Sequence, residues 1–232
     1  MIVLGLDTAT SATAVALLDD ARPDGAIERR HEPAPGERPG HAAQLLGLAA
    51  ELLDEAGLRF ADVDRIAVGL GPGTFTGLRI GVASARALAQ GSDAELVGIS
   101  TLRALAVAAE PAAAPGSGVL AVIDARRGEA FAAGWRDGRP VLEQAASAPA
   151  ALARRVAEEG GAWLAVGDGA LRFRADLEGA GCTVAPDGCA QHNVSARAIC
   201  GLALQSPAIA RDLVVPDYLR LPDAVLARRQ PG

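Results

Sequence analysis

The chain has 232 residues, half of them hydrophobic and only 3% aromatic, with a formal net charge of −6. A hydrophobic share this large supports one large or two small folded domains and argues against long disordered segments. The acidic balance argues against strong independent binding of nucleic acid, because neutralisation of phosphates dominates that affinity. All 22 basic residues are arginine, which excludes a phosphate-loop lysine and a Schiff-base lysine.

Cysteine usage and the start of the chain indicate the compartment. The three cysteines, Cys182, Cys189 and Cys200, show no C-x-x-C spacing, which argues against a disulfide framework or a structural zinc site. The first ten residues, MIVLGLDTAT, lack a basic start and contain Asp7, so they are unlike a signal peptide. No apolar run approaches the length of a membrane span. We therefore expect a cytoplasmic protein without a membrane segment.

The first elements in chain order are strands. Short apolar runs predict strands over residues 2–7 and 12–19, and the intervening TATS has the small hydroxylated residues of a turn. Residues 29–40 are polar and rich in proline, which indicates the end of a third strand followed by a surface loop.

Residues 41–56 form the clearest predicted helix, with Gly57 as its stop. Two apolar stripes run along it at helical spacing: Leu45, Leu48, Leu52 and Ala56 in one, and Leu46, Ala49 and Leu53 in the other. A helix with two such stripes either lies deep in the core or uses its second face for a partner.

A strand over residues 65–71 runs into the glycine-rich segment GPGTFTGLRIG. Thr76 is the expected cap of a second helix, which continues to about Gln90 and stops at Gly91. A strand over 95–99 and a helix from Thr101 to before Pro111 follow, and residues 108–118 are the best candidate linker.

The second half repeats part of this order. Strands are predicted over 119–124, 129–135 and 163–166, and helices over 149–159 and 194–204. Asp7 and Asp124 each end a strand before a hairpin, and glycine-rich turns at 69–73 and 167–169 each end a later strand. This repetition indicates an α/β protein with two related lobes, 1–110 and a smaller 111–232, which is the plan of the actin-like ATPase fold.

The glycine-rich segment between strand and helix permits two interpretations. A helix N-terminus can hold an anion, with Thr74 and Thr76 as hydroxyl donors and Arg79 as a phosphate partner. Alternatively, Gly77 and Gly81 give the helix a small surface for tight packing, which we favour. The segment lacks the lysine of a Walker loop.

Asp7 and the hydroxylated residues after it resemble a phosphate hairpin. A carboxylate at a strand end can hold Mg²⁺ through water, whereas the alternative is a turn held by hydroxyl-to-backbone hydrogen bonds. The candidate phosphate contacts, as vestigial loops, are Asp7, Thr10, Gly73 and Thr74.

Metal and nucleophile chemistry have little support in the sequence. The histidines are His31, His41 and His192, and they form no H-x-x-x-H or H-E-x-x-H pair. The chain also lacks a G-x-S-x-G elbow, so we expect neither a metal site nor a hydrolase site.

Several segments, in order and spacing, resemble the TsaB (YeaZ) family: MIVLGLDTATSATAVALL, PGHAAQLLGLAAELLDEAG, IAVGLGPGTFTGLRIGVASARALAQG, LVGISTLRALA, VIDARRGEAFAAGW and the C-terminal PDYLR. The resemblance implies the actin-like (ASKHA, ribonuclease H-like) fold. It also implies a relationship to the larger catalytic subunit TsaD, which binds ATP and a metal through a histidine motif. Only His41 stands where that motif would begin, and Leu45 stands four residues later, so the resemblance implies a paralogue without the metal site.

The resemblance further implies a non-catalytic scaffold subunit of the complex that forms N6-threonylcarbamoyladenosine at position 37 of tRNA. Its partners would be TsaD, the ATPase TsaE in a larger assembly and a second copy of itself, with tRNA reached only indirectly. No cofactor would be required, and ATP or ADP binding would be weak at most. The helices over 41–56 and 77–90 would form the contacts, and the expected interface residues are Leu45, Leu48, Leu52, Gly77, Ile80, Gly81 and Ser84.

Two competing hypotheses remain. An ATP-binding phosphotransferase or ATPase of the same fold would place phosphates at Asp7, Thr10 and Gly73. A metalloprotease would require stoichiometric zinc.

Overall fold

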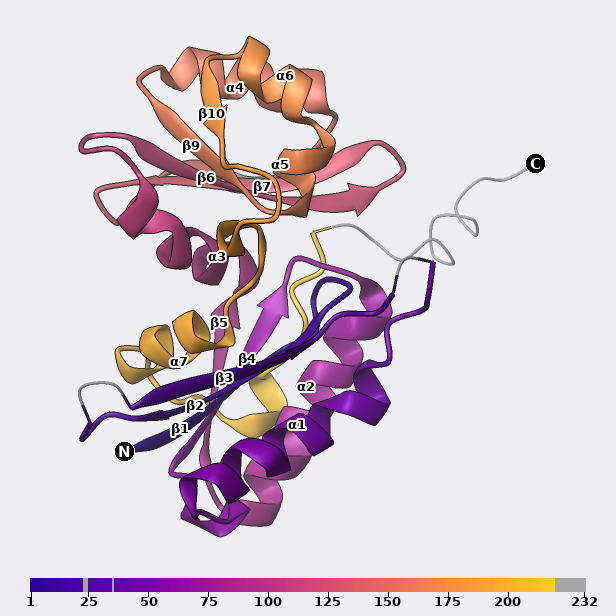
Figure 1. Cartoon of the computed structure of the whole chain (residues 1–232), viewed down its shortest axis with the longest axis vertical. Helices are drawn as coiled ribbons and strands as arrows, with labels where there is room; N and C mark the ends of the chain where they lie inside the picture. The colour runs from indigo at the N-terminus through magenta and orange to yellow at the C-terminus, as the bar shows by residue number, and fades with distance from the viewer. Residues whose placement is uncertain (23–24, 35, 220–232) are drawn as a thin grey trace.

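The structure, a computed structural model, describes residues 1–22, 25–34 and 36–219. It contains two lobes, each built on a five-stranded sheet and stacked along the long axis (Figure 1). The first sheet contains β1 (Ile2–Asp7), β2 (Thr13–Asp19), β3 (Ala26–His31), β4 (Arg65–Gly71) and β5 (Glu95–Ser100). The second contains β6 (Gly118–Arg126), β7 (Glu129–Arg136), β8 (Arg139–Ser147), β9 (Trp163–Val166) and β10 (Cys182–Val184). The last residue of the PDYLR motif, Arg220, and the rest of the expected second lobe to residue 232 lie outside the described residues.

The two sheets have the same topology. The first has the order β3-β2-β1-β4-β5, and the second, read from the corresponding edge, has the order β8-β7-β6-β9-β10. In each sheet the central strand pairs antiparallel with the next strand in sequence and parallel with the later one. The internal duplication predicted from Asp7 and Asp124 is therefore confirmed.

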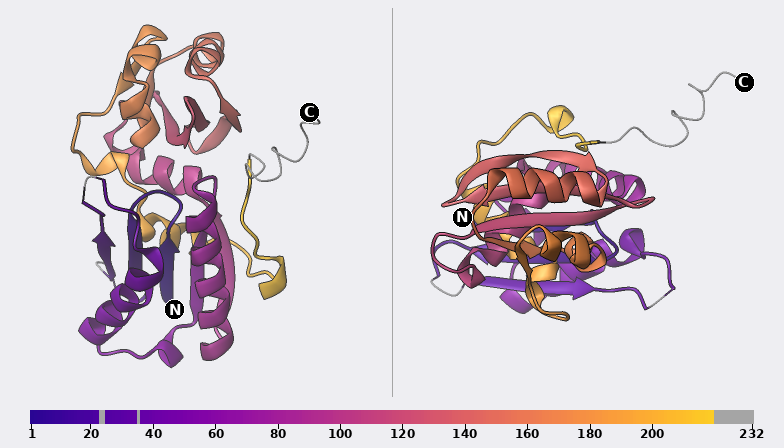
Figure 2. Two further views of the ribbon diagram at one scale, coloured as in Figure 1. Left: turned by 90° about the vertical axis from the view of Figure 1, so that its right-hand side faces the viewer. Right: turned by 90° about the horizontal axis from the view of Figure 1, so that it is seen from above.

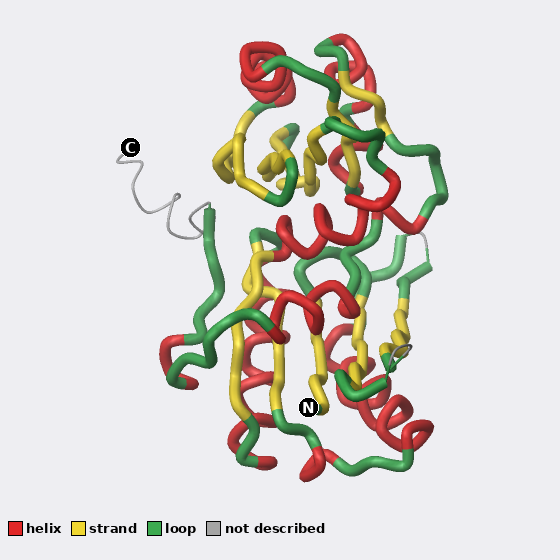
Figure 3. Tube along the Cα trace, turned by 90° about the vertical axis from the view of Figure 1, so that its left-hand side faces the viewer, coloured by secondary structure: helices red, strands yellow, loops and turns green. Residues whose placement is uncertain are grey.

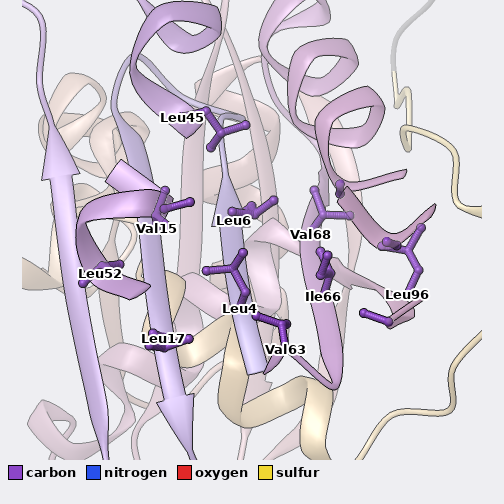
Figure 4. Close-up of a cluster of buried hydrophobic side chains, with 14 of the residues drawn as sticks. Leu4, Leu6, Val15, Leu17, Leu45, Leu52, Val63, Ile66, Val68 and Leu96 are labelled. Carbon is purple, nitrogen blue, oxygen red and sulfur yellow. The ribbon is translucent and has the colours of Figure 1, made fainter. Parts of the chain in front are cut away.

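Two helices, α1 (His41–Ala56) and α2 (Phe75–Ser92), cover one face of the first sheet (Figure 2). The bounds of α1 match the prediction, because the Gly57 backbone adopts the left-handed conformation (φ 69°) and its N–H donates to the carbonyls of the last turn. Figure 4 shows leucines of α1 directed onto aliphatic side chains of the sheet. The labelled core comprises Leu4, Leu6, Val15, Leu17, Leu45, Leu52, Val63, Ile66, Val68 and Leu96.

Each of the two inner helices packs on the sheet of the lobe to which it does not belong in sequence. Helix α3 (Thr101–Ala109) follows β5 but packs on β6 and β7, whereas α7 (Ala196–Leu204) packs on β1 and β2. The two helices also contact each other, and Figure 3 shows helix lying between the two sheets. The expected division at residue 110 therefore separates α7 from the sheet that it covers.

The outer face of the second sheet carries α4 (Pro149–Glu159), α5 (Asp168–Arg172) and α6 (Arg174–Gly179). The sequence pattern does not predict α5, α6, β8 or β10. The expected linker over 108–118 contains the end of α3, a 3₁₀ turn at Glu110–Ala112 and the first residue of β6, so its irregular part is residues 113–117. Further 3₁₀ turns lie at Phe60–Asp62, Ala190–His192 and Arg211–Leu213.

After α7 the chain returns along the first lobe as a segment that we call the C-terminal strap (residues 207–219). The Ile209 N–H donates to the Leu96 carbonyl of the edge strand β5 (3.2 Å), and Val214 is fully buried in the first core. Throughout the part of the chain that the structure describes, every helix is too short or too polar to cross a membrane.

Candidate functional site

The Asp7 carboxylate lies beneath the β1–β2 turn and is only 1% exposed. One of its oxygens accepts the Ala9 N–H (2.9 Å) and the other accepts the Thr101 hydroxyl (3.2 Å). Burial raises the pKa of Asp7 to about 6, against the lowering effect of these hydrogen bonds. In this arrangement the carboxylate is hydrogen-bonded to the β1–β2 turn and to the start of α3.

The glycine-rich loop closes on the same turn. Thr74, and not the predicted Thr76, is the N-cap of α2, and its N–H donates to the Ala9 carbonyl (2.7 Å). A Cβ on Gly73 would lie 2.4 Å from the Ala9 carbonyl oxygen. These contacts favour the packing interpretation. The Ala9 carbonyl lies at the N-terminus of α2, which is the position where an anion would bind.

The next two glycines of α2 are also close to the turn. A Cβ on Gly77 would lie 2.0 Å from the Thr8 carbonyl oxygen, and one on Gly81 would lie 2.4 Å from the Thr8 hydroxyl. The Thr8 hydroxyl donates to the Gly77 carbonyl (2.7 Å). Arg79 lies beyond the first turn of α2, where its Nε donates to the Tyr218 hydroxyl (3.1 Å). The predicted stop at Gly91 is wrong, because α2 continues to Ser92 before Asp93 turns left-handed (φ 57°).

Among the four candidate phosphate contacts, Thr10 lines a cavity between the lobes. The cavity has a volume of about 140 Å³ and is also lined by Ser11, Glu32, Asp168 and His192. Burial raises the pKa of Asp168, whose carboxylate accepts the Asp124 N–H (3.0 Å). Pockets for small molecules commonly measure roughly 300–1,000 Å³. This cavity is smaller than that and carries two carboxyl groups, so it is poorly suited to a nucleotide triphosphate.

The histidines and cysteines lie in structural surroundings. The His41 ring is buried, its Nδ1 lies 2.8 Å from the Thr13 hydroxyl, and burial lowers its pKa. Both His192 ring nitrogens lie within 3.0 Å of backbone carbonyls. Burial raises the pKa of the Cys182 thiol to about 11. Within residues 1–22, 25–34 and 36–219, no group of three or more histidine, cysteine or acidic side chains is arranged to hold a metal.

Four of the seven expected interface residues face the interior of their own lobe. Leu45 and Leu52 are 1% and 0% exposed and belong to the first core (Figure 4). Gly77 and Gly81 are buried against Thr8. These residues provide no exposed contact area, because helical spacing reveals the stripes of a helix but not which stripe meets the sheet. The remaining three are partly exposed: Leu48, Ile80 and Ser84.

The exposed side of α1 and α2 is uncharged over much of its length and rich in small residues. We define the outward helical face by its exposed or half-buried members: Ala43, Leu46, Gly47, Ala50, Ile80, Ala83 and Ala87. Leu46 is 48% exposed, although it is a large apolar side chain. Small side chains beside a leucine suit close packing of helices from another chain.

Gly47 provides a second reason to place a partner here. It lies within α1, where glycine costs about 1 kcal/mol relative to alanine. A Cβ at this position would meet nothing within 4 Å, so the packing of this chain does not require a glycine. A close approach by the backbone or a side chain of another molecule would require one.

Several known proteins resemble this chain in sequence. A family model described as "TsaD: tRNA N6-adenosine threonylcarbamoyltransferase" matches residues 37–162. "tRNA threonylcarbamoyladenosine biosynthesis protein TsaB" of Escherichia coli is 35% identical over 174 residues, covering 73% of this chain and 72% of the relative. The protein of the same name in Haemophilus influenzae is 38% identical over 131 residues, covering 56% of this chain and 52% of the relative.

Solved structures extend the match to the fold. "YeaZ from Pseudomonas aeruginosa" superposes with a TM-score of 0.72 at 27% identity, over 94% of this chain and 100% of that one. A polyphosphate/ATP-glucomannokinase from Arthrobacter (TM-score 0.52, 13% identity, 88% of this chain and 99% of that one) shares the fold alone. The predicted actin-like architecture is thus confirmed. By its sequence, this chain belongs to the TsaB (YeaZ) family.

Proposed function

We propose that this chain is a non-catalytic accessory subunit in the biosynthesis of threonylcarbamoyladenosine at position 37 of tRNA. In this proposal it binds a catalytic relative of the TsaD type, and the outward helical face makes the contact. The names of the Escherichia coli and Haemophilus influenzae relatives support the pathway. The match to the TsaD family model supports a partner with a similar fold.

The observation that carries the proposal is the contrast between two regions of the first lobe. The residues that would form a phosphate site are engaged within the chain: Asp7 by Ala9 and Thr101, and Gly73 by the Ala9 carbonyl. The outward helical face, in contrast, exposes Leu46 and places Gly47 where its own chain leaves open space. This contrast supports a contact surface for another protein on the outward helical face over a phosphate site at the glycine-rich loop.

A partner with the same fold would present an equivalent pair of helices. Two such pairs pack naturally as a four-helix interface, because small residues allow the helix axes to approach closely. The subunit would act by binding one conformation of the catalytic partner more tightly than the others. The proposal includes self-association when the chain is alone, TsaE in a larger assembly, contact with tRNA through the partner, a cytoplasmic location and no required cofactor.

The test is co-purification with the catalytic relative, followed by measurement of threonylcarbamoyladenosine in tRNA. Ala83→Arg and Leu46→Glu place charges on exposed positions of α2 and α1, so the fold should persist. We expect both variants to lose co-purification and to lose modification in a reconstituted reaction. The matched control is Ala157→Arg, which adds the same charge at an exposed alanine of α4 in the other lobe. If Ala83→Arg still co-purifies at the wild-type ratio, the outward helical face is not the contact.

A further inference from the structure

The C-terminal strap joins the two lobes over a short stretch of chain. Val214 is fully buried in the core between the first sheet and its outer helices. Leu219 packs against the cluster formed by α3 and the inner face of the second sheet. The four residues 215–218 therefore connect an anchor in one lobe to an anchor in the other.

Asp217, between these anchors, bonds to both lobes. Its N–H donates to the Leu70 carbonyl in β4 (2.8 Å), and its carboxylate accepts from Nε2 of Gln144 in β8 (2.8 Å). The strap also lies close over the end of β4, because a Cβ on Gly71 would be 3.0 Å from the Asp217 carbonyl oxygen.

Tyr218 connects the same segment to the start of α2. Its ring centroid lies 5.1 Å from that of Phe75, and its hydroxyl accepts from Nε of Arg79 (3.1 Å). The Arg79 guanidinium in turn lies 3.9 Å from the centroid of the Phe75 ring. This stack holds the first turns of α2, a helix of the outward helical face.

We propose that residues 214–219 form an interlobe clasp, which fixes the orientation of the two lobes and couples it to α2. The clasp contacts the lobes on one side only, because Leu213 and Val215 point outward and are 64% and 53% exposed. The coupling to partner binding rests on the proposed function. The fixed orientation of the lobes does not rest on the proposed function, because every contact that maintains this orientation lies within this chain.

The first experiment measures lobe orientation in the isolated full-length chain. Spin labels at Glu51→Cys in α1 and Arg154→Cys in α4 occupy exposed positions in different lobes. A Cys189→Ser background removes the half-buried thiol, and the two buried cysteines stay in place. We expect the double variant Asp217→Ala/Leu219→Ala to broaden or shift the distance distribution.

The matched controls lie in the same segment. Leu213→Ala, just before the clasp, and Val215→Ala, on its exposed side, shorten side chains that point away from the lobes and should leave the distribution at that of the wild type. A circular dichroism spectrum shows whether each variant is folded. If the folded double variant keeps the wild-type distribution, or if the controls broaden it equally, the clasp is overturned.

The second experiment measures affinity for the catalytic relative. Loss of the Asp217 and Leu219 contacts on either side of Tyr218 loosens its hold on Phe75 and Arg79 and leaves the start of α2 to be ordered upon docking. The double variant should therefore bind about three- to tenfold more weakly. Leu213→Ala should bind as the wild type does. Unchanged affinity of the double variant, with binding lost in Ala83→Arg, overturns the coupling and leaves the proposed function standing. If Ala83→Arg retains binding, the proposed function is contradicted. The distance measurement in the isolated chain then still tests whether the clasp holds the lobes.

Discussion

At the scale of single residues, Asp7 is the most unusual group of the first lobe. It is fully buried, and its folded pKa of about 6 lies above the ordinary value of 3.8. Below pH 3.8 the carboxyl is protonated in the folded and unfolded states alike. As the pH rises from 3.8 to about 6, the unfolded state loses its proton first, so this group destabilises the fold progressively. Above pH 6 the cost is constant at up to about 3 kcal/mol.

Asp7→Asn removes that cost, because the amide oxygen can still accept the Ala9 N–H. We expect the free energy of unfolding to rise by about 1–3 kcal/mol at about pH 7.5, with little difference from the wild type at about pH 4. Urea unfolding of both proteins at the two pH values measures this. A variant that is less stable at about pH 7.5 would show that the carboxylate is needed in its charged form, as a Mg²⁺ site would require.

At the scale of helices and strands, the sequence predicts those parts of the fold that carry strong local patterns. The α1 bounds follow from its apolar spacing and from Gly57, and the bounds of α4 and β9 also match. The pattern misses β8, because Leu142 is the single buried residue of this edge strand and the usual alternation is absent. The Asp137–Gly138 pair with positive φ (51° and 72°) is a hairpin signal that could have located it.

The candidate surface was only partly predictable from sequence. The family resemblance predicts that α1 and α2 are the contact helices, yet Leu45 and Leu52 turn inward while Leu46 and Ala83 turn outward. That choice depends on the position of the sheet, which is set by strand pairing between distant parts of the chain. The C-terminal strap could not be predicted for the same reason. The hydrogen bond between Gln144 and Asp217 joins segments that share no local pattern.

Two glycines in neighbouring helices provide a matched prediction at this scale. Gly47→Ala adds a methyl group in open space and should stabilise the isolated chain by about 0.5–1 kcal/mol. The same change should weaken binding of the catalytic relative, because it thickens the outward helical face. Gly77→Ala meets the Thr8 backbone and should destabilise the chain by about 3 kcal/mol.

Thermal unfolding of the two variants, with affinity measured for Gly47→Ala, checks this pair. A Gly47→Ala chain that is more stable and binds with wild-type affinity would show that a close partner contact does not require glycine at this position. Destabilisation by Gly47→Ala would show that its helix is constrained by contacts of its own lobe.

At the scale of the whole molecule, the exchange of inner helices makes each lobe depend on the other. Helix α7 buries Ala196, Ile199, Cys200 and Ala203 against the first sheet, although it follows the second lobe in the chain. Helix α3 does the converse for the second sheet. If the chain is divided near residue 110, the first sheet loses α7 and the second sheet loses α3. Each piece then exposes an apolar inner face of its sheet.

We therefore expect the chain to unfold in one cooperative transition and the fragment 1–110 to fail to fold alone. Both tryptophans, Trp135 and Trp163, lie in the second sheet, so their fluorescence follows that lobe, whereas far-ultraviolet ellipticity follows both. Urea transitions monitored by the two signals should coincide, because loss of one lobe removes a covering helix from the other. Two separated transitions, or a fragment 1–110 with a cooperative transition of its own, would show that α7 adds little to the first lobe.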